Sequence, residues 1–358
     1  MPIITTTIFL FIGSLIVSYI LMPKIRSLAK NSNFNSIPNN RSSHLDIVPN
    51  IGGVAFYVTL MLSFYYIFPY DENGLLRSIL PGLTILFIIG LKDDLVIVAS
   101  STKFIAQIVA GFFLVMNPSF QLLDMKGFLW IFHNNYFLAF ALSILIIVTI
   151  INSINLIDGI DGLAGIISII ICSTFSIIFF ILKEYSLFFV TIVLIGSILA
   201  FLRFNISKSS KIFMGDTGSM ILGFLIAVMT IRLFTISSVK HDLLIIPIQN
   251  LPYFIFSILS IPLIDTIRVF SLRIMNGKSP FVADRNHIHH VVLDRFKLSH
   301  FSTSLLLGLI NVFILLVFSI FTFYLSQIWL ILLTILIILI VILSVNNLKS
   351  KTKSDINV

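Results

Sequence analysis

Long apolar runs alternate with short polar segments along nearly the whole chain. A helix needs about 20 apolar residues to cross the hydrocarbon core of a bilayer, and most of these runs come close to that length. The pattern predicts eleven membrane-spanning helices, at residues 3–22, 51–69, 75–91, 103–116, 136–152, 162–182, 186–203, 218–236, 252–271, 302–324 and 327–346. Within 243–264, Pro247, Pro252 and Pro262 interrupt the pattern and favour a broken or interfacial helix.

The composition excludes a soluble domain and a disordered chain. Of the 358 residues, 58% are hydrophobic and 11% are charged, whereas a soluble domain carries about 25% charged residues. We therefore expect an all-α, polytopic integral membrane protein. A single transmembrane domain should occupy residues 1–346, followed by a short cytoplasmic tail at 347–358.

The lysines and arginines give the expected orientation. Of these 23 residues, 18 follow odd-numbered predicted helices, 4 follow even-numbered ones and Arg232 lies within a helix. Because basic residues collect in cytoplasmic loops, we expect the N-terminus outside and the C-terminus in the cytoplasm. The basic residues are spread over separate loops and form no nucleic-acid-binding motif, so no nucleic acid partner is expected.

Carboxylates collect at the predicted cytoplasmic ends of the helices. Asp93 and Asp94 end the third apolar helix, where anions are unfavourable because the helix dipole is already negative there. The pair could be a solvated helix end. It would otherwise need a cation, either Lys92 or a metal, and hard oxygen ligands suit Mg²⁺ or Mn²⁺.

A second polar segment follows the fifth predicted helix and contains Asn152, Asn155, Asp158 and Asp161. If the segment is helical, the last three of these side chains share one face. The glycines beside them could serve helix packing instead. Packing does not explain two carboxylates and two amides, so we favour a binding site.

Asp216 lies between two glycines just before the eighth predicted helix. A helix N-terminus binds anions through its free N–H groups. Asp216 or Thr217 could alternatively cap this helix. Capping does not require glycine on both sides, so a ligand site is favoured here as well.

The segment from Asp284 to His290 contains Arg285, His287, His289 and His290. Such side chains can bind phosphate oxygens and a sugar, and a zinc-binding or pH-sensing loop is the alternative. Arg41 and His44 lie in an earlier turn-rich loop. They could also reach a phosphate, although isolated loop residues of this kind are usually solvated.

These segments, in this order, resemble the polyprenyl-phosphate N-acetylhexosamine-1-phosphate transferases, whose superfamily includes the phospho-N-acetylmuramoyl-pentapeptide transferase. The resemblance runs from about residue 36 to residue 295. It implies transfer of a sugar 1-phosphate from a UDP-sugar to undecaprenyl or another polyprenyl phosphate, with release of UMP and with Mg²⁺ or Mn²⁺ as cofactor. It also implies a bacterial inner (plasma) membrane enzyme that starts a lipid-linked glycan of O-antigen, capsule, enterobacterial common antigen or teichoic acid type.

The resemblance assigns roles to individual residues. It implies Asp216 and Asp94 as metal ligands, Asp93, Asp94, His289 and His290 as catalytic residues, and Arg41, His44, Asn152, Asn155, Asp158, Asp161, Arg285 and His287 as substrate-binding residues. The loop motif around Arg41 often begins with Asp in the family, and Ser36 stands there in this chain. This departure weakens the assignment for that loop. The identity of the sugar stays open, and a homodimer is one expectation for the assembly.

The physical chemistry favours the same activity. Phosphoryl transfer depends on charge neutralisation and positioning more than on covalent help. One alternative is a transporter, but the carboxylates gather at one face and the sequence contains no inverted repeat. Another is an intramembrane aspartyl protease, because Gly215 and Asp216 resemble its signature. That reading leaves the histidine cluster unexplained.

The charge bias generates a first testable prediction. A topology reporter fused after Lys211 should report the cytoplasm, and one fused near Lys126 should report the outside, because these loops follow odd-numbered and even-numbered helices respectively. Reporter activity in intact cells measures both. If Asp94 and His289 mapped to opposite sides of the membrane, a single site containing both would be excluded.

Overall fold

The computed structural model describes residues 2–31, 35–36, 48–122, 135–237, 243, 246–277, 279 and 286–356. Its helices are α1 (Ile3–Asn31), α2 (Gly53–Ile67), α3 (Leu75–Leu95), α4 (Ser100–Val115), α5 (Tyr136–Ile157), α6 (Leu163–Ile181), α7 (Tyr185–Asn205), α8 (Gly215–Ser237), α9 (Leu251–Ile258), α10 (Ser260–Met275), α11 (Ile288–Phe296), α12 (His300–Tyr324) and α13 (Gln327–Ile356). Short 3-10 helices occupy Phe68–Tyr70 (η1), Pro118–Phe120 (η2) and Ile248–Asn250 (η5). Strands β1 (Asn35–Ser36) and β2 (Val48–Pro49) pair antiparallel. Arg41, His44 and Arg285 lie outside the described residues.

Nine of the described helices are long and apolar enough to cross a membrane, namely α1, α2, α3, α5, α6, α7, α8, α12 and α13. Helices α9 and α10 form a further pair that is bent by 76°, and α4 is shorter, with 16 residues. The bend confirms the broken helix expected within 243–264. The all-α, multi-pass architecture is confirmed, and the exact count of eleven stays a prediction.

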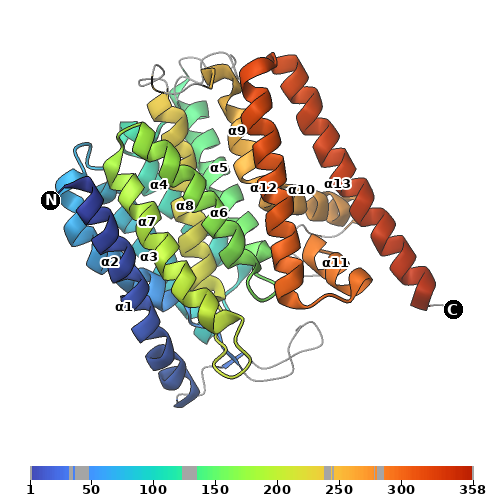
Figure 1. The fold of residues 1–358 in the computed structure, drawn as a ribbon, viewed down its shortest axis with the longest axis horizontal. Helices are drawn as coiled ribbons and strands as arrows, with labels where there is room; N and C mark the ends of the chain where they lie inside the picture. Colours follow the sequence, from blue (N-terminus) through green and yellow to red (C-terminus); the bar gives the residue numbers. More distant parts are fainter. Residues whose placement is uncertain are drawn as a thin grey trace.

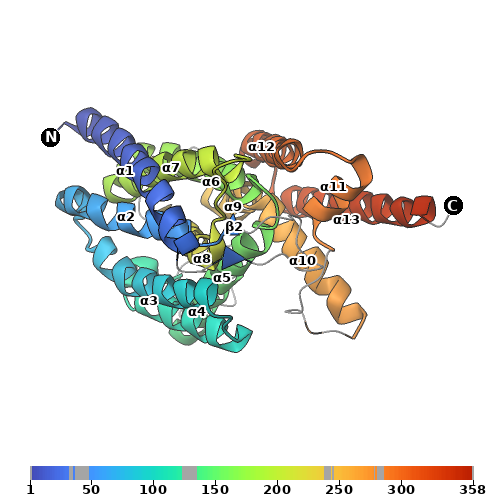
Figure 2. The same cartoon turned by 90° about the horizontal axis from the view of Figure 1, so that it is seen from below.

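Helix α8 lies at the centre of the bundle and packs against α2, α3 and α5 (Figures 1 and 2). In its most apolar stretch 89% of the residues are buried, compared with 11% in α13. Helix α8 is therefore enclosed by other helices, whereas α13, which is also apolar, leaves most of its surface uncovered. Helices α12 and α13 stand at one side of the bundle (Figure 1), and α10, which contacts both, runs outward beside them (Figure 2).

Glycines allow α2 and α3 to approach the first turns of α8. A Cβ atom at Gly53 would overlap backbone atoms of Thr217 and Gly218, and one at Gly90 would overlap Thr217. Small residues at such crossings let membrane helices pack closely. The packing therefore brings the end of α3 next to the beginning of α8.

A buried ion pair holds the opposite end of α8. Arg232 Nη2 lies 3.0 Å from Glu184 Oε2, and Arg232 Nη1 donates to the carbonyl of Ser119. Both charged side chains are almost fully buried, which is tolerated because each has a partner. Contacts thus hold α8 near both ends, and they fix the position of its N-terminus along the axis of the bundle.

The close helix crossing generates a second prediction. Gly53→Val should lower the thermal stability of the detergent-purified protein, because the added atoms overlap the backbone of α8 and overpacking typically costs about 1–3 kcal/mol. Gly13→Val is the matched control, since a Cβ at Gly13 meets nothing within 4 Å. Equal melting temperatures for the two variants would contradict the close packing of α2 on α8.

Candidate active site

The carboxylate of Asp94, in the last turn of α3, caps the N-terminus of α8. Its Oδ1 accepts the N–H of Asp216 at 2.7 Å, and its Oδ2 accepts the N–H and the hydroxyl of Thr217 at 3.0 and 2.5 Å. Gly215 adopts a positive φ of 73° at this point. A Cβ there would overlap the Asp94 carboxylate and the carbonyl of Asn50. The anion at this helix N-terminus is therefore the protein's own carboxylate, and neither Asp216 nor Thr217 caps the helix with its side chain.

A short ribbon holds the segment that leads into α8. Gly52 and Gly53 donate their N–H groups to the carbonyls of Phe213 and Met214, each at 2.9 Å. The N–H of Phe213 in turn donates to Pro49 at 2.9 Å. From this ribbon, the Asn50 side chain donates to Asp94 Oδ1 at 3.2 Å. The polar segment before α2 thus fixes both the capping carboxylate and the chain beside Asp216.

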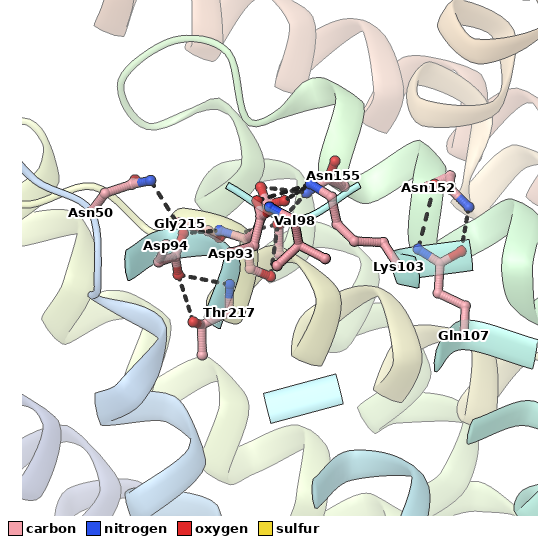
Figure 3. A network of polar contacts seen from close by, with 12 residues as sticks. Asn50, Asp93, Asp94, Val98, Lys103, Gln107, Asn152, Asn155, Gly215 and Thr217 are labelled. Carbon is pink, nitrogen blue, oxygen red and sulfur yellow. Dashed lines mark hydrogen bonds and ion pairs between the residues drawn. The ribbon is translucent and has the colours of Figure 1, made fainter. Parts of the chain in front are cut away.

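Lys103, in the first turn of α4, joins two carboxylates from different helices (Figure 3). Its Nζ donates to Asp93 Oδ2 at 2.9 Å and also to Asp216 Oδ2. The second Asp93 oxygen accepts the N–H of Val98 at 2.7 Å. Lys92, the cation that the sequence placed beside these acids, is exposed. The cation that meets them is Lys103, which in the sequence is only one of the 18 basic residues after odd-numbered predicted helices.

Two amides of α5 line the same region (Figure 3). Asn155 donates to Asp216 Oδ1 at 3.1 Å and to the Ser219 hydroxyl at 2.8 Å. One turn earlier, Asn152 donates to the amide oxygen of Gln107 at 2.7 Å. Asn155 therefore belongs to the carboxylate centre, whereas Asn152 joins α5 to α4 beside it.

The segment after Asn155 turns away from the helix. Helix α5 ends at Ile157, and Gly162 has a positive φ of 83° directly before α6. The segment is therefore not one continuous helix, which was the condition for Asn155, Asp158 and Asp161 to share one helical face. The glycines of this segment allow a turn that a continuous helix would not contain, and the turn separates the three side chains.

Asp158 and Asp161 have opposite electrostatic surroundings. Burial raises the pKa of Asp158 well above its usual range, and the carboxylates of Asp216 and Asp94 raise it further. Burial would also raise the pKa of Asp161, but hydrogen bonds from His300 and Lys211 hold it below its usual value. Asp161 Oδ2 lies 2.6 Å from the Lys211 amine and 3.0 Å from His300 Nδ1. Asp161 thus connects the turn to α12 and to the loop before α8.

The histidine segment forms the beginning of α11, and all three histidines are buried. His287 Nδ1 lies 2.7 Å from Asp265 Oδ2, and Asp265 Oδ1 accepts the N–H of Ile288 at 2.8 Å. The other ring nitrogen of His287 lies 3.5 Å from a guanidinium nitrogen of Arg273. Helix α10, which carries Asp265 and Arg273, therefore contacts both ring nitrogens of His287.

The next histidine reaches the turn between α5 and α6. A Cβ at Gly159 would overlap the ring of His289, so this ring packs directly on the backbone beside Asp158. The rings of His289 and His290 are 4.3 Å apart. The fold thus brings the histidine segment and the acidic turn together although about 130 residues separate them in the chain.

Oxygen donors that suit a hard cation converge at Lys103. Asp93 and Asp216 each direct one carboxylate oxygen to its amine. Among the described residues, no group of three His, Cys, Asp or Glu side chains could hold a metal ion. Mg²⁺ is commonly bound by one or two carboxylates together with substrate phosphates and water. The pair fits an ion that is completed by a phosphate, and Asp94, whose oxygens accept the N–H groups of α8, is less suited to it.

Several residues of the site have no role in the prediction from the sequence, namely Asn50, Lys103, Gln107, Ser219, Lys211, Arg268, Arg273, Asp265 and His300. A charged residue at the end of an apolar helix was a usable signal for Lys103 and Asp265. The others are polar or basic residues whose partners lie elsewhere in the chain, so only the fold identifies them.

Residues 76–234 match the family described as Glycosyl transferase family 4. The chain is 32% identical over 305 residues to the probable undecaprenyl-phosphate N-acetylglucosaminyl 1-phosphate transferase of Bacillus subtilis (strain 168), which covers 84% of this chain and 81% of that protein. It is 27% identical over 303 residues to the undecaprenyl-phosphate alpha-N-acetylglucosaminyl 1-phosphate transferase of Escherichia coli (strain K12), covering 80% and 73%. The corresponding Haemophilus influenzae protein is 31% identical over 263 residues, covering 72% and 70%.

The chain belongs to the polyprenyl-phosphate N-acetylhexosamine-1-phosphate transferase family. This confirms the family that the sequence motifs resemble. The matched residues 76–234 contain the carboxylate centre around Lys103 and the acidic turn, whereas the histidine segment lies beyond them. The roles assigned to individual residues of this transferase stay predictions.

The Lys103 contacts generate a third prediction. Lys103→Met should lower the rate of sugar-phosphate transfer by at least about 100-fold, the usual effect of removing one preorganised donor from an active site. Lys92→Met is the matched control, because Lys92 is exposed on the neighbouring helix, and it should keep nearly the full rate. Initial rates with purified, monodisperse protein measure both. Similar losses in the two variants would contradict a special role for Lys103.

Proposed function

We propose that this protein transfers N-acetylglucosamine 1-phosphate from UDP-N-acetylglucosamine to undecaprenyl phosphate, releases UMP and so starts a lipid-linked glycan. The printed names of its relatives support these substrates. The observation that carries the proposal is the convergence of Lys103, Asp93 and Asp216 at one end of apolar helices. At such an end a lipid phosphate and a soluble nucleotide can meet.

The reaction needs positioning and charge compensation. An oxygen of the lipid phosphate attacks the phosphorus that carries the sugar. The bond from this phosphorus to the bridging oxygen breaks, and that oxygen leaves on UMP. Lys103 and Asn155 would orient Asp216. His289 and His290 would bind phosphate and sugar oxygens beside the acidic turn. Asp94 would act as a positioning residue, because its oxygens hold the N-terminus of α8.

A divalent cation belongs to the proposal. Asp216 and Asp93 are the residues that would hold Mg²⁺ or Mn²⁺, because one oxygen of each carboxylate lies at the same cation, the amine of Lys103. When bound, such an ion neutralises charge on the phosphate oxygens. Asn155 would keep one Asp216 oxygen oriented by its hydrogen bond of 3.1 Å.

We also propose that the site faces the cytoplasm of a bacterial inner membrane, with eleven spans, the N-terminus outside and the C-terminus inside. The distribution of 18 and 4 basic residues between the two sets of loops supports this orientation. UDP-sugars are cytoplasmic metabolites, so the same orientation gives the site access to its donor.

The rival activities have less support. An aspartyl protease would not account for the histidine segment, which the fold brings onto the acidic turn at Gly159. A transporter would need a polar path along the bilayer. At the far end of α8, the buried side chains of Arg232 and Glu184 instead form an ion pair with each other.

The decisive experiment follows UMP release. Protein in undecaprenyl phosphate-containing nanodiscs is incubated with UDP-N-acetylglucosamine, UDP-N-acetylgalactosamine or a UDP-6-deoxy-N-acetylhexosamine. We expect UMP and a lipid-linked sugar with the first donor, and loss of activity in EDTA with recovery in Mg²⁺ or Mn²⁺. Asp216→Asn should remain inactive at saturating metal while eluting as folded protein. Full activity in EDTA would exclude the metal, and no UMP with any donor would exclude the function.

The contacts of Asp93 generate a further prediction. Both of its oxygens already accept hydrogen bonds, from Lys103 and Val98, and a phosphate monoester with a second pKa of about 6 needs little proton removal at neutral pH. Asp93→Asn should therefore lose most activity through misplacement of Lys103. The ratio of wild-type to mutant kcat/KM should stay roughly constant from about pH 6.5 to 9.

A general base would behave differently. It contributes about 10²–10⁴-fold, and raising the pH partly replaces it. A ratio that shrinks by about ten-fold or more toward high pH would therefore identify Asp93 as the base. Asn152→Ala is a useful comparison, because Asn152 bonds to Gln107 and not to the carboxylate pair.

A further inference from the structure

Helix α13 faces outward along most of its length but is buried near both ends, where Leu330 packs with Tyr253 and Phe318 at the N-terminal end. Only 11% of its most apolar stretch is buried, whereas Val345, near its C-terminal end, is 4% exposed. Helix α13 also packs against α11 (Figure 1). Residues 347–356 continue the helix beyond the predicted span. The contact with α11 is therefore local, and it lies beside the histidine segment.

A buried arginine connects α13 to that segment. Arg268 of α10 is 1% exposed. Its Nε and Nη2 donate to Asn346 Oδ1 of α13 at 3.3 and 3.1 Å, and its Nη1 donates to the carbonyl of Asn286 at 2.5 Å. Lys349, one turn after Asn346, donates to the side-chain oxygen of Asn286. Asn286 is thus held from α10 through its backbone and from α13 through its side chain.

The residues that follow Asn286 reach the active site. Asp265, one turn before Arg268 on α10, holds the ring of His287 and the N–H of Ile288. Two residues further on, His289 packs on Gly159 of the acidic turn. Any movement of Asn286 would therefore be passed through His287 to the His289 ring that packs on Gly159.

We propose that Arg268 and Asn346 form a positioning latch through which α13 fixes the histidine segment against the acidic turn. The latch residues do not touch the reacting groups. They act through Asn286 and His287, and a displacement of about 1 Å at reacting groups can cost roughly 100-fold in rate. A helix outside the matched residues 76–234 thus takes part in the transferase site. The activity arm of its test rests on the proposed function.

The test uses the full-length protein in nanodiscs and four variants of α13. Asn346→Leu removes the acceptor at similar size, and Asn346→Ser is too short to reach Arg268. Asn346→Asp keeps the acceptor and adds a charge partner for Arg268. Ser344→Ala is the matched control, because Ser344 is exposed on the same helix. Size-exclusion profiles and melting temperatures establish which variants are folded.

Two measurements report on the latch. The first is hydrogen exchange of the amides of residues 286–296 by mass spectrometry, which needs no substrate. Exchange should become at least about five-fold faster in Asn346→Leu and Asn346→Ser, and should stay near wild type in Asn346→Asp and Ser344→Ala. The second is UMP release, where kcat should fall at least about ten-fold in the first two variants with little change in the KM for undecaprenyl phosphate.

The outcomes separate the latch from the proposed function. Wild-type exchange and wild-type kcat in folded Asn346→Leu or Asn346→Ser would overturn the latch. Faster exchange together with a lowered kcat in Asn346→Asp would also overturn the latch, because this variant keeps the oxygen that accepts from Arg268 and should behave like wild type. If the wild-type protein releases no UMP from any donor, the proposed function fails while the exchange data still decide whether α13 fixes the segment.

Discussion

The hydrogen bonds from the first turn of α8 to the Asp94 carboxylate determine the arrangement of the rest of the site. Asp94 ends one apolar helix and neutralises the N-terminus of another, so the unfavourable negative end of α3 meets the favourable positive end of α8. This contact places Asp93 and Asp216 on the two sides of the same junction. Lys103 can then reach both with one amine, and neither carboxylate is left without a cation.

The junction is defined because the packing around it leaves little room for movement. Gly53 and Gly90 bring α2 and α3 onto the backbone of α8, and the pair of Arg232 and Glu184 fixes the far end of that helix. A carboxylate at the edge of an apolar bundle is costly unless donors meet it. Here the N–H groups of a helix end, an amide and a lysine supply the donors, so the structure that binds the helices together also prepares the polar site.

The sequence predicted most of the helices because apolar length is a strong local signal, and Pro262 and its neighbours marked the broken helix. Other features depend on partners that are distant in the chain. Lys92 is adjacent to Asp93, yet neighbouring residues on a helix point about 100° apart, and the cation comes from Lys103 on the next helix. Helix α11 has nine residues and mixed polarity, so no periodic pattern in the sequence predicted it. Asn155 and Asp161 do not share a helical face, because the chain turns at the glycines between them and the helix does not continue.

The site therefore combines two parts of the chain that meet at Gly159. The carboxylate centre comes from α3, α4, α5 and α8. The histidine segment is held by α10 through Asp265 and Arg268, and Lys349 of α13 donates to Asn286 just before it. Where the parts meet, the ring of His289 occupies the space that any side chain at position 159 would fill. The glycine beside Asp158 is thus required by contact with a distant imidazole. Packing between neighbouring membrane helices, which the glycine spacing also suggested, does not explain this position.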